Sequence, residues 1–279
     1  MHQPLSVAER VLNSVQSIRR DAWHAVRSLA KERAFTFVCV ASLGIGLGAV
    51  VALATLTRLI NAPAQGIDTH GLTEVLIVPN GPLRAKAGVW ALDRWSYPDY
   101  QALRGADTGM ALTAWTLESS EIGTRTAEEK TPERAATLYV SANYFSTLGV
   151  ALARGSGFDT ATDDTPAAAP RVVVSHDFWR SRMASDPAVI GKTVIVEGIP
   201  HVVVGVTPEN FRGHFHVFQA PASLLFIPLE RHPRLRADAA VREDRTKEWL
   251  RVYGRLFPRV DITRANRLVA ATAAGLAQR

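Results

Sequence analysis

The sequence has almost no cysteine and, over one long stretch, no charge at all. Its single cysteine, Cys39, excludes a disulfide within the chain and a metal site built from paired thiolates. No Asp, Glu, Lys or Arg occurs from Ala34 to Thr57, a run of 24 residues of which 11 are Phe, Leu, Ile or Val. A helix of this length measures about 36 Å, enough to cross a hydrocarbon core of about 30 Å. We interpret this run as a permanent transmembrane helix.

Other readings of this run fit less well. A soluble core helix seldom lacks a polar face over about six turns. Ala62-Pro63-Ala64 resembles a cleavage site for an export signal, but the basic region before the run is long, and the run exceeds the usual core of about 7–15 residues. Gly44, Gly46 and Gly48 resemble a phosphate-binding loop, yet no strand precedes them and no Lys-Ser/Thr pair follows.

Basic residues gather on the N-terminal side of the apolar run. An excess of Lys and Arg marks the cytoplasmic flank of a span, so we expect a cytoplasmic N-terminus and export of the chain after about Asn61. The net charge of +6 is thus explained by membrane topology. The remaining basic residues are mixed with acids and lack an aromatic platform, so no nucleic-acid partner is expected. The topology determinants are Arg19, Arg20, Arg27, Lys31 and Arg33.

The chain is expected to have three parts. Residues 1–33 form a basic amphipathic helix on the cytoplasmic face, or alternatively a frayed basic tail, because apolar residues from Leu12 to Leu29 recur at helical spacing. Residues 34–60 are the transmembrane helix, and residues 61–279 are the exported domain. Within the span, small residues at intervals of four let a second helix approach closely. These helix-packing positions are Gly44, Gly48 and Ala52.

The exported part mixes strands and helices without regular alternation, which favours an α+β fold. A hairpin is expected around Glu197-Gly198, and helix starts are expected at Ser96, Ser175 and Asp261. Composition predicts a loop over residues 158–170, with solvated acidic side chains and no calcium site. Strands are expected over residues 72–79, 112–123, 133–140, 171–174, 192–206, 223–229 and 248–256.

A search for catalytic residues finds none. The sequence contains no Gly-x-Ser-x-Gly, no His-Glu-x-x-His and no P-loop. His214 and His216 could supply two metal ligands, but no third is evident, and we expect a surface or hinge strand there. The consecutive residues Ser175, His176 and Asp177 cannot form a relay from one turn. We therefore predict no enzymatic activity, no cofactor and no metal.

Five stretches together resemble a known family, the MacB-like periplasmic core domain of FtsX-like ABC transporter permeases. The resemblance runs from about Asp21 to the end, with the blocks in the family's order and spacing. In the first span, Val50 occupies a position at which the family pattern has Asn. The stretches are "RDAWHAVRSLAKERAFTFVCVASLGIGLGA", "SYPDYQALR", "YVSANYFSTLGV", "RVVVSHDFWRSRMASDPAVIGKTVIVEGIPHVVVGVTPENFRG" and "WLRVYGRLFPRVDITRA".

The resemblance implies a permease subunit of the bacterial inner membrane, with its domain in the periplasm. Its implied partners are membrane lipid, a cytoplasmic ABC ATPase, and a second copy or the remaining half of the permease. ATP-driven motion would be transmitted to the periplasmic domain during export. Because no second spanning run follows, we expect a fragment, a truncated gene product or one half of a split permease. The alternative is a standalone, membrane-anchored periplasmic binding or adaptor module without transport activity.

Overall fold

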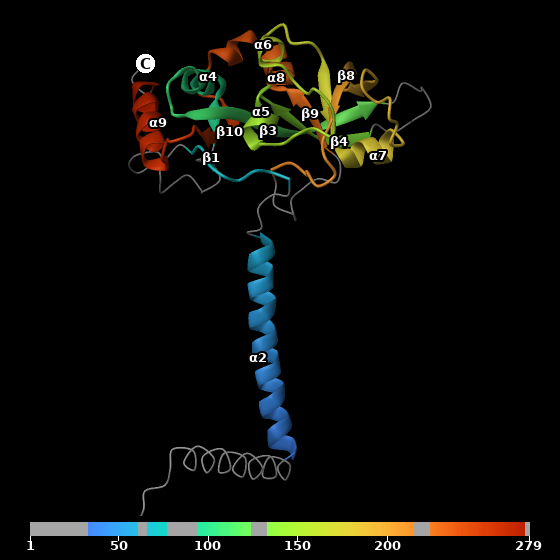
Figure 1. The fold of residues 1–279 in the computed structure, drawn as a ribbon, viewed down its shortest axis with the longest axis vertical. Helices are drawn as coiled ribbons and strands as arrows, with labels where there is room; N and C mark the ends of the chain where they lie inside the picture. The colour runs from blue at the N-terminus through green and yellow to red at the C-terminus, as the bar shows by residue number, and fades with distance from the viewer. Residues whose placement is uncertain (1–32, 61–65, 77–93, 124–132, 215–223, 277–279) are drawn as a thin grey trace, which may run out of the picture. The chain divides into compact units, whose positions relative to one another are not determined.

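The chain divides into two units, residues 1–61 and residues 62–279, each described here by itself. The structure is a computed structural model (Figure 1). It describes residues 33–60, 66–76, 94–123, 133–214 and 224–276. The expected cytoplasmic helix, with Arg19, Arg20, Arg27 and Lys31, lies outside the described residues.

The described part of the first unit is one long helix, α2 (Arg33–Ile60). Its segment Val40–Arg58 has a mean hydropathy of 2.0 and is not buried against other parts of the chain. The hydroxyl groups of Thr55 and Thr57 donate to carbonyl oxygens one turn earlier, each at 2.8 Å, so these polar groups are satisfied within the helix. The helix expected over this run is confirmed, and by length and composition it can cross a membrane.

The second unit is built on one mixed sheet in the order β1-β10-β3-β4-β9-β6-β8-β5 (Figure 1). The pairs β4–β9 and β6–β8 are parallel, and the other neighbours are antiparallel. The predicted α+β class is therefore confirmed. The strands are β1 (Leu72–Glu74), β2 (Trp95–Ser96), β3 (Met110–Gly123), β4 (Glu133–Val140), β5 (Arg154–Gly155), β6 (Arg171–Val174), β7 (Thr193–Val196), β8 (Ile199–Val206), β9 (Leu224–Pro228) and β10 (Glu248–Leu256).

Short helices connect the strands, and three helices begin where the sequence predicts them. The side chains of Ser96, Ser175 and Asp261 each accept the backbone N–H three residues on, at 3.3, 3.2 and 2.7 Å. Such caps satisfy a donor that the first helical turn leaves unpaired. The helices are α4 (Tyr97–Gly105), α5 (Tyr144–Leu148), α6 (Thr160–Asp163), α7 (His176–Arg182), α8 (Pro233–Ala237) and α9 (Ile262–Leu276), with 3-10 turns η2 (Leu229–Arg231) and η3 (Ala239–Arg242).

The predicted hairpin joins β7 to β8. Glu197 and Gly198 both have positive φ, 49° and 73°, as a two-residue turn between twisted antiparallel strands requires. The strand predicted over residues 72–79 is shorter, because β1 ends at Glu74. One backbone hydrogen bond between the two chain segments lies beyond the end of β1: the N–H of Val75 donates to the carbonyl of Val252 at 2.9 Å.

The core lies on both faces of the sheet. Along β9, Leu225 and Ile227 belong to one buried cluster, whereas Leu224 and Phe226 belong to the other. Successive side chains of a strand point to opposite faces, so β9 is covered on both sides. Its unbroken apolar sequence is typical of such a central strand.

Candidate functional site

The segment of residues 66–76, which we call the post-helix segment, follows α2 in sequence and is bound to the edge of the sheet. The N–H of Asp68 donates to the carbonyl of Leu148 at 3.1 Å, and the N–H of Leu256 donates to the carbonyl of Gly71 at 2.9 Å. β1 then pairs with β10, with Leu72 opposite Arg255. Backbone bonds thus join this segment to both α5 and β10.

The Arg255 side chain adds a second attachment, which we call the Arg255 anchor. Its Nη1 donates to Asp68 Oδ2 at 3.0 Å and to the His70 carbonyl at 2.6 Å. Its Nη2 donates to the Asp68 carbonyl at 2.5 Å, and its Nε donates to the Thr147 carbonyl at 2.5 Å. One planar guanidinium therefore connects β10, the post-helix segment and α5 in a fixed geometry.

Charge and hydrogen bonding at the anchor also favour the ionised form of Asp68. The His70 N–H donates to its carboxylate at 3.0 Å, and this bond, with the nearby Arg255 guanidinium, lowers the pKa of Asp68. The Asp68 side chain remains 58 % exposed, whereas that of Arg255 is 20 % exposed. The distinguishing property of this site is therefore the arrangement of hydrogen bonds around the Arg255 guanidinium, and not the burial of a charge pair.

A glycine makes the close approach of Asp68 to α5 possible. Gly149 ends α5 in the left-handed conformation at φ 69°. A Cβ at this position would lie 2.8 Å from the Cβ of Asp68, closer than such atoms approach. Gly149 is thus required both by its backbone conformation and by the neighbouring post-helix segment.

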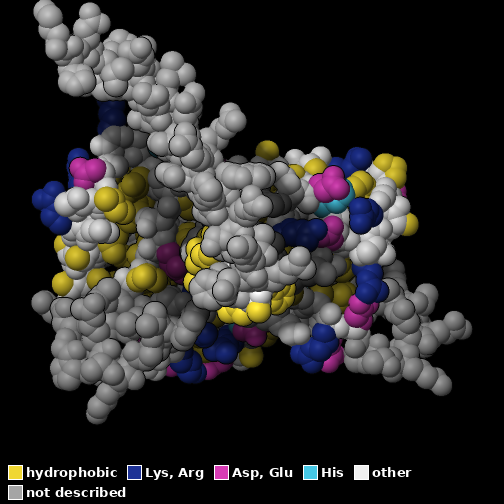
Figure 2. Space-filling view, turned by 90° about the horizontal axis from the view of Figure 1, so that it is seen from below, with side chains coloured by type: hydrophobic (Ala, Val, Ile, Leu, Met, Phe, Trp, Pro, Cys, Tyr) yellow, Lys and Arg dark blue, Asp and Glu magenta, His cyan; other side chains and the backbone are white. Residues whose placement is uncertain are grey.

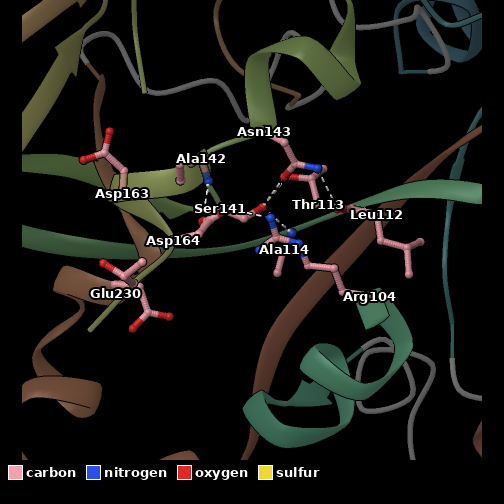
Figure 3. A network of polar contacts seen from close by, with 12 residues as sticks. Arg104, Leu112, Thr113, Ala114, Ser141, Ala142, Asn143, Asp163, Asp164 and Glu230 are labelled. Carbon is pink, nitrogen blue, oxygen red and sulfur yellow. Dashed lines mark hydrogen bonds and ion pairs between the residues drawn. The ribbon is translucent and has the colours of Figure 1, made fainter. Parts of the chain in front are cut away.

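A network of polar contacts joins β3, β4, α4 and the α6 segment (Figure 3). Ser141 and Thr113 share a hydrogen bond of 2.7 Å between their hydroxyls, and the Ser141 Oγ also accepts the Ala114 N–H at 3.0 Å. Asp164 accepts the Ala142 N–H at 2.7 Å and pairs with Arg104 at 2.6 Å. The end of β4 is thereby held to three other parts of the fold.

The solvated loop predicted over residues 158–170 is wrong in part. Residues 160–163 form α6, and the side chain of Asp163 is completely buried. Its Oδ2 accepts the Asp159 N–H at 2.9 Å and pairs with Arg171 at 3.1 Å. Local composition predicts exposure of an acidic residue, but an arginine on β6 and a backbone donor compensate for the burial.

The consecutive residues Ser175, His176 and Asp177 have structural contacts. The Ser175 hydroxyl oxygen accepts the N–H groups of Phe178 and Leu224, at 3.2 and 3.0 Å. Asp177 faces Arg212 at 3.6 Å. Ser175 therefore caps α7 and ties it to β9.

The surface or hinge strand predicted at His214 is also wrong, because this residue lies in no strand and contacts an aromatic cluster. Its ring centroid is 3.8 Å from that of Trp115, and its Nδ1 is 2.7 Å from the hydroxyl of Tyr144. Burial lowers the pKa of His214 to about 3. His216 lies outside the described residues, and those that are described contain no group of three or more possible metal ligands.

The predicted packing positions lie on α2. A Cβ added at Gly44 or Gly48 would meet no atom within 4 Å, and Ala52 is exposed. Arg33 is the first residue of α2.

Acidic and basic side chains are interspersed with hydrophobic ones on the face drawn in Figure 2.

Sequence reasoning missed the Arg255 anchor. Arg255 reads as an ordinary polar position of a predicted strand, and its partners Asp68 and Thr147 precede it by 187 and 108 residues. No local pattern connects residues so distant. The glycine at position 149, directly after α5, was the available signal for a tight C-terminal cap.

Known protein families and solved structures include proteins that are similar to this chain. The family model of the MacB-like periplasmic core domain matches residues 36–272. The crystal structure of the periplasmic region of MacB from Actinobacillus actinomycetemcomitans superposes with a TM-score of 0.53 at 17 % identity, covering 76 % of this chain and 86 % of that one. The extracellular domain of the noncanonic ABC-type transporter YknZ from Gram-positive bacteria has a TM-score of 0.49 at 15 % identity, covering 73 % and 95 %.

No curated protein matches the sequence. The similarity to MacB, at this identity, supports the fold, whereas the family match extends over most of the chain. It includes all but the first three residues of α2, all ten strands of the described residues and most of α9. The chain belongs to the family of the MacB-like periplasmic core domain, a component of ABC transporter permeases.

Proposed function

We propose that this chain is a non-enzymatic permease subunit that conveys ATP-driven movement from the membrane to a periplasmic domain. In this proposal α2 spans the inner membrane, with the N-terminus in the cytoplasm and the second unit in the periplasm. The ATPase is a separate cytoplasmic partner, and the domain contacts export cargo or other components. Membership of the permease family supports this assignment.

The observation that carries the proposal is the double attachment of the post-helix segment. A loose linker would absorb displacement of a membrane helix, because a flexible chain transmits little force. Here the Arg255 anchor and the β1–β10 pairing hold residues 68–75 on the sheet. A pull on this segment would therefore act on β10 directly.

The composition of α2 supports its place in the bilayer. Large apolar side chains such as Phe37, Leu43 and Ile45 are more than 70 % exposed on it. An exposed apolar surface of this extent is stable in lipid and unfavourable in water. The arginines and lysine that precede it favour a cytoplasmic N-terminus.

The small residues on α2 support a role in assembly. Gly44, Gly48 and Ala52 repeat every four residues and lie on one face of the helix, where the absence of bulky side chains lets two backbones approach closely. We propose that this face packs against a second copy or against the remaining spans of a permease.

Co-purification tests the partnership. The tagged chain, extracted from its native membrane in mild detergent, should retain an ABC ATPase. Absence of an ATPase would favour the alternative, an anchored binding or adaptor module. A reporter enzyme active only outside the cytoplasm, fused near residue 100, should be active, and an inactive but folded fusion would contradict the proposed orientation.

Hydrogen exchange tests the transmission step. In the complex with its ATPase, trapping with ATP and vanadate should change amide exchange both in the post-helix segment and in β10. In Arg255→Gln, the change should persist in the segment and shrink in β10. Equal changes in both proteins would show that the anchor transmits nothing. Arg267→Gln, an exposed arginine on α9, is the matched control.

A further inference from the structure

A cleft of 440 Å³ lies on the second unit between β3, β10, α8 and the residues before β2. Its volume is within the range of sites that hold small molecules, about 300–1,000 Å³. Trp115 and Glu118 of β3 contribute to its lining, as do Trp249 and Arg251 of β10. Arg94 and Arg234 also line the cleft.

Two of the arginines are positioned by the tryptophans. Arg251 and Trp115 are opposite each other on neighbouring strands, and the guanidinium carbon lies 5.3 Å from the indole centroid. The guanidinium carbon of Arg234 lies 5.7 Å from the indole centroid of Trp249. Cation–π contacts of this kind hold the side chains in place without neutralising their charge. Both indoles are themselves only 4 % exposed, so the platform under each guanidinium is fixed by the core.

The lining has an excess of positive charge. Among the described residues it contains three arginines and one carboxylate, that of Glu118. Within the described part of the chain, Arg94 and Arg234 take part in no ion pair. Guanidinium groups held apart from carboxylates retain their donors for a bound anion, and Arg presents these donors in a planar fork that suits carboxylate or phosphate.

Polar N–H groups lie beneath the arginines. The indole N–H of Trp249 is buried and has no acceptor. His232 is 2 % exposed; its Nδ1 accepts the Arg234 backbone N–H at 3.1 Å, and its Nε2 lies 3.5 Å from Glu118 Oε1. Since Nδ1 accepts, the proton of the neutral ring is on Nε2. Burial lowers the pKa of His232 to about 3, so the ring is a neutral donor beside Glu118.

We propose that this cleft binds a small ligand that carries an acidic group, a phosphate or carboxylate, on a planar apolar body. The acidic group lies among the guanidinium groups of Arg94, Arg234 and Arg251. The planar body stacks on the guanidinium faces that point away from the indoles, because a guanidinium is flat and weakly hydrated. A cationic ligand is disfavoured, because the aromatic faces already carry arginines. The inference concerns ligand recognition and does not depend on an ATPase or on the orientation of α2.

Phenyl phosphate is a suitable probe, titrated calorimetrically into the full chain in a non-ionic detergent at low salt. Saturable binding with a Kd below about 1 mM is expected. The double variant Arg94→Gln/Arg234→Gln should weaken binding at least tenfold, because both rim charges are lost. Arg267→Gln, which removes an exposed arginine elsewhere, should leave Kd unchanged.

A second variant should strengthen phenyl phosphate binding instead of weakening it. Glu118→Gln removes the carboxylate that the described residues contribute to the lining. It should tighten binding about threefold, as expected for removal of one like charge several ångströms away in a hydrated cleft. Its side chain is 42 % exposed, so the fold should tolerate the change. Circular dichroism and the Tm of each variant check this tolerance.

Three results would overturn the inference. One is the absence of saturation by phenyl phosphate up to about 10 mM. Another is an unchanged Kd in the folded double variant or in Glu118→Gln. The third concerns the planar body alone: inorganic phosphate should bind at least tenfold more weakly than phenyl phosphate, and equal affinities would eliminate that part of the proposal.

Discussion

Arg255 and Asp68, which are 187 residues apart in the sequence, are joined by a guanidinium that donates to both the carboxylate and the backbone carbonyl of Asp68, at 3.0 and 2.5 Å. The first of these residues is the next-to-last residue of β10, the last strand of the domain in sequence order. The second lies a few positions after the apolar helix α2. The contact therefore holds the segment that follows α2 to β10, beside the β1 edge of the sheet.

Loss of this contact should lower the stability of the second unit. Arg255→Gln removes charge-assisted hydrogen bonds to three carbonyl groups, and the free energy of unfolding should fall by about 1–3 kcal/mol. Arg255→Lys should not restore it, because an ammonium cannot reach acceptors spread along a planar fork. Urea denaturation measures both, with Arg267→Gln expected within about 0.5 kcal/mol of wild type. Equal stability of all three proteins would refute a structural role for the anchor.

The close contact between Gly149 and Asp68 predicts a difference between two glycine substitutions. Gly149→Ala places a Cβ in a left-handed backbone and 2.8 Å from Asp68 Cβ. Gly198→Ala introduces the same kind of backbone strain, at φ 73°, with no atom within 4 Å. The second change should cost about 1 kcal/mol and the first about 1–3 kcal/mol more. Equal stabilities of the two variants in thermal unfolding would show that the post-helix segment moves away from the added methyl group without lowering the free energy of unfolding.

The buried side chain of Asp164 should contribute more than surface acids do. Asp164→Ala leaves the Ala142 N–H and the Arg104 guanidinium without their partner, and should lower the free energy of unfolding by about 2–4 kcal/mol. Asp164→Asn keeps an acceptor for Ala142 and should cost about half as much. The exposed Glu209→Ala is the control, expected to have little effect. Equal stabilities for the Ala and Asn variants would contradict the role of the Ala142 bond.

Acid should destabilise the domain in part through His232. Its pKa is lowered from 6.5 to about 3 by burial and by Arg234, so the folded state favours the neutral ring. The stability that depends on this ring is fully present above pH 6.5 and is lost as the pH falls towards 3. His232→Phe should reduce the slope of unfolding free energy against pH in that window by up to about 1.4 kcal/mol per pH unit.

The same two proteins supply the control for this measurement. Above pH 7 the slopes of wild type and His232→Phe should coincide, since the ring is neutral in folded and unfolded chains alike. Parallel slopes across the whole range, from pH 7.5 down to about 3, would show that His232 is accessible to protonation in the folded state.

Helix association in the membrane should depend on one face of α2. In a bacterial dimerisation reporter, Gly44→Leu/Gly48→Leu should reduce the signal to that of a non-associating span, because leucine keeps the backbones apart. Gly46→Leu is the matched control, since position 46 lies on the opposite face of the helix. A similar loss for both would indicate that bulk anywhere on the helix, rather than this face, is decisive.

Local features of the fold are readable from the sequence because they depend on residues within a few positions of one another. The uncharged run makes α2, Glu197-Gly198 makes the hairpin turn, and the Ser96 and Ser175 hydroxyls cap the helices that follow them. The α+β class follows from the order of such elements. The family resemblance rested on the same local blocks.

Tertiary structure decided which polar residues meet. Asp163 reads as an exposed loop residue until Arg171 of β6 is placed beside it, and Arg255 acquires its role only when β1 is paired with β10. The cleft likewise exists because β3 and β10 are neighbours although more than a hundred residues separate Trp115 from Arg251. A charged side chain is buried or exposed according to the partner that the strand order brings to it, and strand order is a property of the whole sheet that no short window of sequence contains.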